Sequence, residues 1–157
     1  MKAASILLLA AGIGTMSNVT GVQASSLVEA SDPEKIVQLA RGFGSATLGT
    51  DDYGDPLITG RIDSNKYGIY FYNCEDNKDC ENIVFSAAWA DQPVSLQRIN
   101  EWNETQLFGT AYLDEDGDPN IDMPVNLKYG VSSSNFDDTI DWWMLTMKEF
   151  EKYIQDN

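Results

Sequence analysis

The sequence has 157 residues without a histidine, and its 25 acidic against 10 basic side chains give a formal net charge of −15. Within this sequence, the absence of histidine excludes Ser-His and Cys-His catalysis and the commonest zinc ligand. So acidic a surface repels phosphate backbones and anionic lipid, and we expect the mature chain to bind neither nucleic acid nor membrane.

Residues 1–24 have the three-part pattern of a cleavable export signal. Lys2 gives a positive start, an apolar core follows, and small residues stand one and three positions before a predicted cut after Ala24. The apolar core is well short of the roughly 18 residues that span a bilayer. The sequence therefore predicts that residues 25–157 form one domain in the periplasm or outside the cell. A cut after Ala30 is the alternative.

The mature chain begins with a predicted helix and a predicted pair of strands. Residues 31–34 supply a capping side chain and a proline for the first turn of the helix, and Gly42 is a natural end. Residues 45–50 and 57–63 flank an acidic turn and are typical of paired strands.

Two further strand-like runs, residues 67–72 and 82–87, flank a polar loop with the only two cysteines of the sequence. Residues that face each other across a hairpin have Cα atoms about 4.5–5.5 Å apart, which suits a disulfide, and export would oxidise the pair. A redox-active pair is disfavoured, because the spacing is not Cys-x-x-Cys and the neighbouring acids oppose a thiolate. We expect a structural disulfide between Cys74 and Cys80. Apolar side chains on both faces of residues 82–87 predict a central strand.

A short second helix is predicted after Ser95, which can cap it, with Leu96, Ile99 and Trp102 along its apolar side. We interpret Trp102 as a core residue. For Asn103 the pattern favours either a C-terminal cap or an amide that bonds the backbone of the next strand.

The next hairpin has an acidic turn with an Asp-Gly step between two predicted strands, residues 107–113 and 121–127. Pro124 cannot donate to a strand ladder, which predicts an edge position or a bulge there. Asp122 stands among apolar neighbours in mid-strand. If buried, it needs a partner and has a perturbed pKa, whereas the alternative is an outward-facing carboxylate.

The last predicted helix runs from about residue 136 to residue 154. Its apolar side chains recur at alternating steps of four and three, the spacing of a stripe that must be covered. Trp142, Leu145 and Tyr153 lie off that stripe; they are candidates for a protein interface, or are covered by the first helix or a loop. The element order α-β-β-β-β-α-β-β-α predicts an α+β fold with an antiparallel sheet flanked by helices.

Two carboxylate functions remain as alternatives. Oxygen-bearing side chains alternate from Asp114 to Asp122, as in a calcium loop, but glycine stands at the fourth place and Val125 replaces the bidentate glutamate of an EF-hand. A plain turn is the better interpretation. Paired carboxylates can hydrolyse glycosides without histidine, yet no motif selects a pair. No catalytic residue, metal ligand or cofactor is therefore predicted.

Several motifs occur together in one order. They are the aromatic strand before Cys74, Cys80 before an apolar strand, residues 99–103 and 112–119, and a closing helix with Trp143 and Phe150. This combination resembles the YbjN family of bacterial proteins, which carry the label of sensory transduction regulators. The resemblance implies a fold similar to type III secretion chaperones, which often pair as homodimers. The export signal and the cysteine hairpin fit a secreted branch of the family.

From the residues and the resemblance together, we expect an exported, non-enzymatic regulatory module that binds an unknown protein partner, with a chaperone-like fold and a homodimer as one expected form. A carboxylate-dependent hydrolase and a calcium-dependent binding domain are the alternatives. A binding module should expose Trp142 and Leu145 together, whereas a hydrolase should bring two carboxylates together in a pocket.

Overall fold

Across residues 27–156, the part that the computed structural model describes, the elements follow the predicted order, and the α+β fold class is confirmed. The predicted signal segment and the cut after Ala24 lie outside the described residues. The elements are α1 (Pro33–Ala40), β1 (Ser45–Thr50), β2 (Pro56–Ile62), β3 (Asn65–Tyr72), β4 (Asn82–Ala88), α2 (Leu96–Thr105), β5 (Thr110–Leu113), β6 (Pro119–Asn126) and α3 (Ser133–Gln155).

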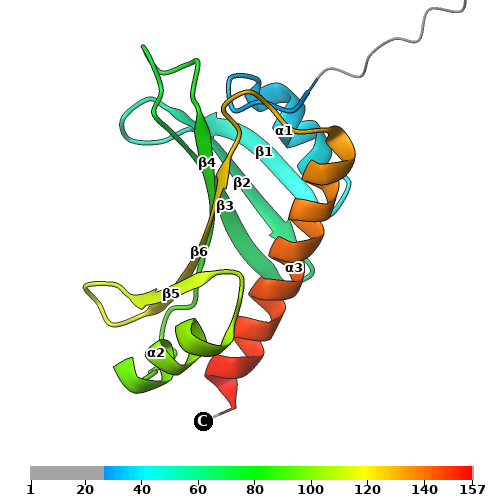
Figure 1. Cartoon of the computed structure of the whole chain (residues 1–157). Helices are drawn as coiled ribbons and strands as arrows, with labels where there is room; N and C mark the ends of the chain where they lie inside the picture. Colours follow the sequence, from blue (N-terminus) through cyan, green and yellow to red (C-terminus); the bar gives the residue numbers. More distant parts are fainter. Residues whose placement is uncertain (1–26, 157) are drawn as a thin grey trace, which may run out of the picture.

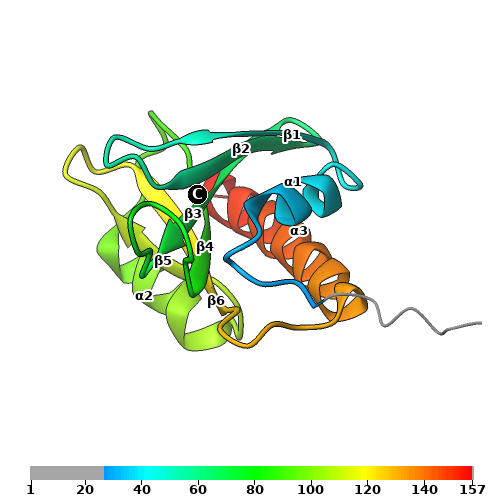
Figure 2. The same ribbon diagram turned by 90° about the horizontal axis from the view of Figure 1, so that it is seen from above.

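The strands form one antiparallel sheet in the order β1-β2-β3-β4-β6-β5. The predicted central position of β4 is confirmed, because β4 pairs with β3 on one side and β6 on the other. Figures 1 and 2 show α1 and α3 on the same face of the sheet, and α2 beside β5 at the end of the molecule where β5 closes the sheet. We call the opposite face the outer face; none of the helices within residues 27–156 covers its centre.

The core lies between the sheet and α3. Trp143 is fully buried, and its ring lies 5.6 Å from that of Phe85 on β4 and 6.4 Å from that of Tyr67 on β3. The predicted stripe of the last helix is buried throughout and consists of Phe136, Ile140, Trp143, Met147, Phe150 and Ile154. Among residues 27–156, no helix combines the length and the apolar character that crossing a bilayer requires.

Three details of the predicted elements were wrong. The last helix begins at Ser133, one turn earlier than predicted, because the Ser132 hydroxyl caps it by accepting from the Asn135 backbone N–H. Leu96 is exposed and does not join the apolar side of α2. The strand predicted from residue 107 begins at Thr110.

At Pro124, β6 is locally an edge strand, as predicted. Because β5 pairs only with the Pro119–Asp122 part of β6, Pro124 lies beyond the end of β5, where one side of β6 has no neighbouring strand. Its missing backbone N–H therefore costs no ladder hydrogen bond on that side.

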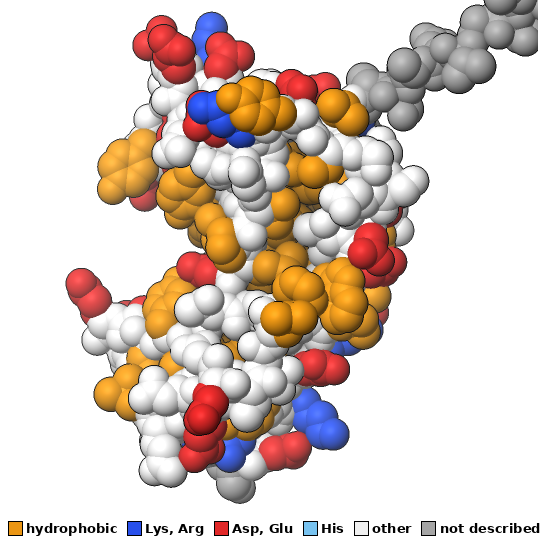
Figure 3. All heavy atoms as spheres, in the orientation of Figure 1, with side chains coloured by type: hydrophobic (Ala, Val, Ile, Leu, Met, Phe, Trp, Pro, Cys, Tyr) orange, Lys and Arg blue, Asp and Glu red, His pale blue; other side chains and the backbone are white. Residues whose placement is uncertain are grey.

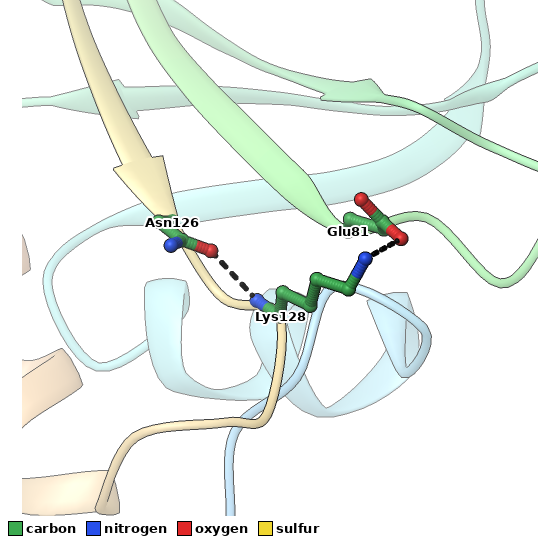
Figure 4. Close-up of polar contacts among 3 residues, drawn as sticks. All are labelled: Glu81, Asn126 and Lys128. Carbon is green, nitrogen blue, oxygen red and sulfur yellow. Dashed lines mark hydrogen bonds and ion pairs between the residues drawn. The ribbon is translucent and has the colours of Figure 1, made fainter.

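The predicted disulfide between Cys74 and Cys80 is confirmed, with Cα atoms 3.8 Å apart. Directly after it, the Glu81 carboxylate pairs with the Lys128 ammonium at 2.6 Å, and the Asn126 side chain accepts from the Lys128 backbone N–H at 3.0 Å (Figure 4). The hydrogen bond and charge of Glu81 raise the pKa of Lys128. These contacts tie the disulfide hairpin to the connection between β6 and α3.

Candidate functional site

Four hydrophobic side chains lie exposed together beside α3. Leu107 is 88 % exposed, Phe108 37 %, Trp142 45 % and Leu145 46 %, and all four line a pocket of about 240 Å³. The rings of Phe108 and Trp142 are 4.8 Å apart. Figure 3 shows hydrophobic side chains gathered over the middle of α3 and the adjacent loop. We call this group the α3 patch; it brings together the predicted interface residues Trp142 and Leu145.

The two sides of the α3 patch are positioned by separate local causes. Trp142 and Leu145 are three residues apart on α3 and so share a helix face, away from the buried stripe. Leu107 and Phe108 precede Gly109, whose φ of +79° turns the chain into β5. A Cβ at Gly109 would come within 2.7 Å of Ile121 and Thr146, so only glycine permits this close approach.

Acidic side chains border the α3 patch, beside Lys148, whose ammonium pairs with the Asp63 carboxylate. Asp138 and Asp141 stand four residues before Trp142 and Leu145, and all of them are exposed on the same helix. Glu149 lines the pocket itself. Residues four apart on a helix are neighbours on its surface, so the apolar patch has an acidic border.

Trp102 and Asn103 hold α2 against β5. Trp102 is 2 % exposed, as expected of a core residue, and its indole N–H donates to the Gly109 carbonyl at 3.2 Å. The Asn103 amide donates to the Ala111 carbonyl at 3.0 Å, and its oxygen accepts from the Ala111 N–H at 2.8 Å. The amide thus pairs with β5 as a neighbouring strand would, which is the second of its two predicted roles.

Tyr153 lies outside the α3 patch. The Arg98 guanidinium stands 4.2 Å from the centre of its ring, and the Tyr153 hydroxyl donates to the Arg98 carbonyl at 3.0 Å. The Arg98 guanidinium also donates to the Tyr153 carbonyl. The element that covers Tyr153 is therefore α2, and the expectation of cover by the first helix or a loop was wrong.

Asp122 lies half-buried on the outer face of the sheet. Its Oδ1 atom is buried without a hydrogen-bond partner among the described residues. The Tyr112 hydroxyl interacts with the Asp122 carboxylate and the Ser86 hydroxyl. Burial raises the pKa of Tyr112, and the charge of Asp122 raises it further.

Replacing Asp122 with asparagine should lower the pKa of Tyr112 without returning it to the ordinary value of 10.0, because the effect of burial remains. The folded-state pKa lies above that of the unfolded chain, so Tyr112 contributes stability below pH 10 that is lost as the pH rises through the folded-state pKa. NMR titration of labelled tyrosine rings, assigned with Tyr112→Phe, measures the midpoint. An unchanged midpoint in Asp122→Asn would show that the carboxylate does not act on this phenol.

In the acidic turn between β5 and β6, the Asp114 carboxylate accepts hydrogen bonds from the turn itself. Asp114 Oδ1 accepts from the backbone N–H groups of Asp116 and Asp118 at 3.1 and 2.9 Å, and Oδ2 accepts from the Asn120 amide at 3.1 Å. These hydrogen bonds lower the pKa of Asp114. Within residues 27–156, there is no group of three or more acidic or cysteine side chains arranged to hold a metal ion.

A second acidic turn, between β1 and β2, borders a pocket of about 440 Å³ together with Tyr70 and Tyr72. Its carboxylates also organise the chain. Asp51 accepts from the backbone N–H groups of Tyr53 and Asp55 at 2.9 and 3.0 Å, and Asp55 accepts from the Asn77 amide at 2.9 Å. These oxygens serve the turn and the neighbouring hairpin.

Two groups of exposed residues were not predicted from the sequence: Leu107 and Phe108 of the α3 patch, and the tyrosines of the outer face. The apolar pattern predicts a strand that includes Leu107 and Phe108, but Gly109 with its positive φ ends the turn there and β5 begins at Thr110. Tyr70, Tyr72 and Tyr112 alternate with buried residues on their strands, and this alternation was the signal for an aromatic outer face.

A family model described as "YbjN: Putative bacterial sensory transduction regulator" matches residues 32–156. The match spans every helix and strand of the structure. The chain matches no curated protein sequence and no solved structure.

Proposed function

The chain belongs to the YbjN family, and from this premise we propose that it is an exported regulatory module that acts by binding a protein and not by catalysis. The α3 patch carries the proposal. Exposed aromatic and large aliphatic side chains that surround a pocket are typical of protein interfaces. Here Phe108 and Trp142 supply the aromatic anchors, with Leu107 and Leu145 beside them.

The proposed partner presents apolar side chains flanked by lysine or arginine. Asp138, Asp141 and Glu149 border the α3 patch, and complementary charge at the edge of an interface speeds association and rejects wrong partners. A second copy of this chain would bring the same acidic border to the patch. Like charges that face each other oppose pairing, so a different, basic protein fits the surface better.

Export is part of the proposal. The leader pattern of residues 1–24 and the disulfide between Cys74 and Cys80 suit an oxidising compartment. Val28 is fully buried and pairs with Val131 through two backbone hydrogen bonds of 2.8 and 3.0 Å. A cut after Ala30 would remove this contact, which supports the cut after Ala24.

The test uses a synthetic amphipathic peptide of leucine and lysine, titrated against the full mature protein and followed by calorimetry. We expect Trp142→Ala combined with Leu145→Ala to weaken binding by at least about tenfold, because interface anchors carry most of the binding free energy. Leu96→Ala is the matched control, since Leu96 is 65 % exposed on α2 outside the patch. It should change the affinity by less than about twofold.

Equal binding by the patch variant and the wild type would overturn the proposal, as would equal binding of a leucine-glutamate peptide. Small-angle scattering tests whether a second copy of this chain occupies the α3 patch. A monomer of the mature length should have a radius of gyration near 14 Å. A larger particle that dissociates in the patch variant would assign the surface to a second copy instead.

A further inference from the structure

The outer face of the sheet carries a group of aromatic side chains around one carboxylate. Tyr70 and Tyr72 stand on β3 and Tyr112 on β5, and all three are at least 37 % exposed. Asp122 lies between them on β6. We call these four residues the tyrosine cup. Figure 3 shows the molecule hollowed on its left side, with hydrophobic side chains gathered along the hollow, on the side of β4 and β6 that faces away from α3 in Figure 1.

The floor of the cup consists of small residues in one cross-strand row. Gly68 on β3 lies opposite Ser86 on β4, and Ser86 lies opposite Asp122. A Cβ placed at Gly68 would come within 2.7 Å of the Tyr70 ring, so this ring leans over the glycine toward the row. Gly68, Tyr70 and Ser86 line one pocket of about 280 Å³ on this face, and Lys66 and Asn120 line it too.

Strand register places the side chain of Asp122 on the same face of the sheet as the three tyrosines. The Asp122 charge raises the pKa of both Tyr72 and Tyr112, after the larger effect of burial on each. The Asp122 Oδ1 atom is buried with no hydrogen-bond partner among the described residues, so the carboxylate is not fully satisfied within them.

Within residues 27–156 neither ion pair involves Asp122, although the exposed Lys66 of β3 lies at the pocket that Gly68 and Ser86 line. The two ion pairs within residues 27–156 join Glu81 to Lys128 and Asp63 to Lys148. Acidic side chains also continue beyond the cup, because Asp51 and Asp52 border the pocket that Tyr70 and Tyr72 line. The surface thus offers negative charge along a path from β6 to the turn between β1 and β2.

We propose that the tyrosine cup binds an arginine side chain of a basic peptide segment, with the guanidinium over the tyrosine rings and bonded to Asp122. Cations are attracted to aromatic faces, most strongly where water is excluded, and a guanidinium can donate two parallel hydrogen bonds to a carboxylate. The acidic turn favours a peptide over a small cation, because its carboxylates suit a second basic residue. This site is separate from the α3 patch and does not rest on the function proposed for it.

The test titrates the full mature protein with a short glycine-arginine peptide, using calorimetry and NMR shifts of the tyrosine rings. We expect saturable binding that shifts the Tyr70, Tyr72 and Tyr112 resonances and weakens at least about tenfold in Asp122→Asn, since the charge-assisted bonds are lost. Glu104→Gln removes the same charge from exposed α2 and should change the affinity by less than about threefold. Thermal unfolding checks that each variant is folded.

A citrulline peptide keeps the shape of the arginine peptide without its charge, and it should not bind. If tetramethylammonium competes with the arginine peptide, this supports a cation-binding site in the tyrosine cup. Tetramethylammonium that binds where the arginine peptide does not would overturn the peptide as occupant. Equal losses in Asp122→Asn and Glu104→Gln would also overturn the proposal, because they would reveal only long-range attraction. Trp142→Ala should leave peptide binding unchanged, so failure of this site and failure of the α3 patch are distinguishable.

Discussion

Replacing Trp102 with alanine is expected to lower the free energy of unfolding by about 3–5 kcal/mol, the usual cost of removing a buried tryptophan. Trp102 is 2 % exposed, and its ring lies 5.0 Å from Phe150 and 5.4 Å from Tyr153 on α3. It also donates to the Gly109 carbonyl. Its loss removes the buried ring that packs between α2 and α3, while the Asn103–Ala111 and Arg98–Tyr153 contacts remain. Urea denaturation followed by circular dichroism measures the change.

Trp102→Phe separates packing from hydrogen bonding. The phenylalanine keeps an aromatic ring between α2 and α3 but cannot donate to Gly109, so we expect a smaller loss than for alanine, with about 1 kcal/mol from the hydrogen bond. If Trp102→Ala cost less than Trp102→Phe, or if neither changed the denaturation midpoint, Trp102 would not be the residue that fixes α2.

The disulfide variant Cys74→Ala with Cys80→Ala should lose about 2.4 kcal/mol of unfolding free energy on the chain-entropy model, because the closed loop no longer restricts the unfolded chain. The loss also has a local consequence. The Asn77 amide in this loop donates to the Tyr53 carbonyl at 3.1 Å and to Asp55 at 2.9 Å. Without the disulfide, these hydrogen bonds to the turn between β1 and β2 should weaken.

Denaturation in the presence and absence of a reducing agent tests this prediction. The reductant should lower the stability of the wild type to that of the alanine variant and leave the variant unchanged. Hydrogen exchange should rise in residues 74–80 and in the turn at residues 51–55, while β4 stays protected. A variant as stable as the wild type would mean that the disulfide does not stabilise the hairpin.

Features that depend on residues close together in the sequence were predictable. The stripe of α3 and the alternation of β6 follow from the period of a helix and of a strand, so their buried faces were visible in the sequence. The bond between Cys74 and Cys80 closes a hairpin across a separation of 6 residues, where few alternative geometries exist. The start of α3 was misplaced because its cap is a single serine among several, and only backbone geometry selects Ser132.

The order of the elements, the buried faces of β6 and α3 and the disulfide could be predicted from the sequence, because each depends on neighbours along the chain. Which surfaces stay exposed depends on how distant segments pack together. The sheet order places β6 between β4 and β5, which brings Ser86, Asp122 and Tyr112 together from three strands. Likewise, Phe108 meets Trp142 only when the loop before β5 packs beside α3. Contacts between distant segments depend on strand pairing and packing, which local periodicity does not encode.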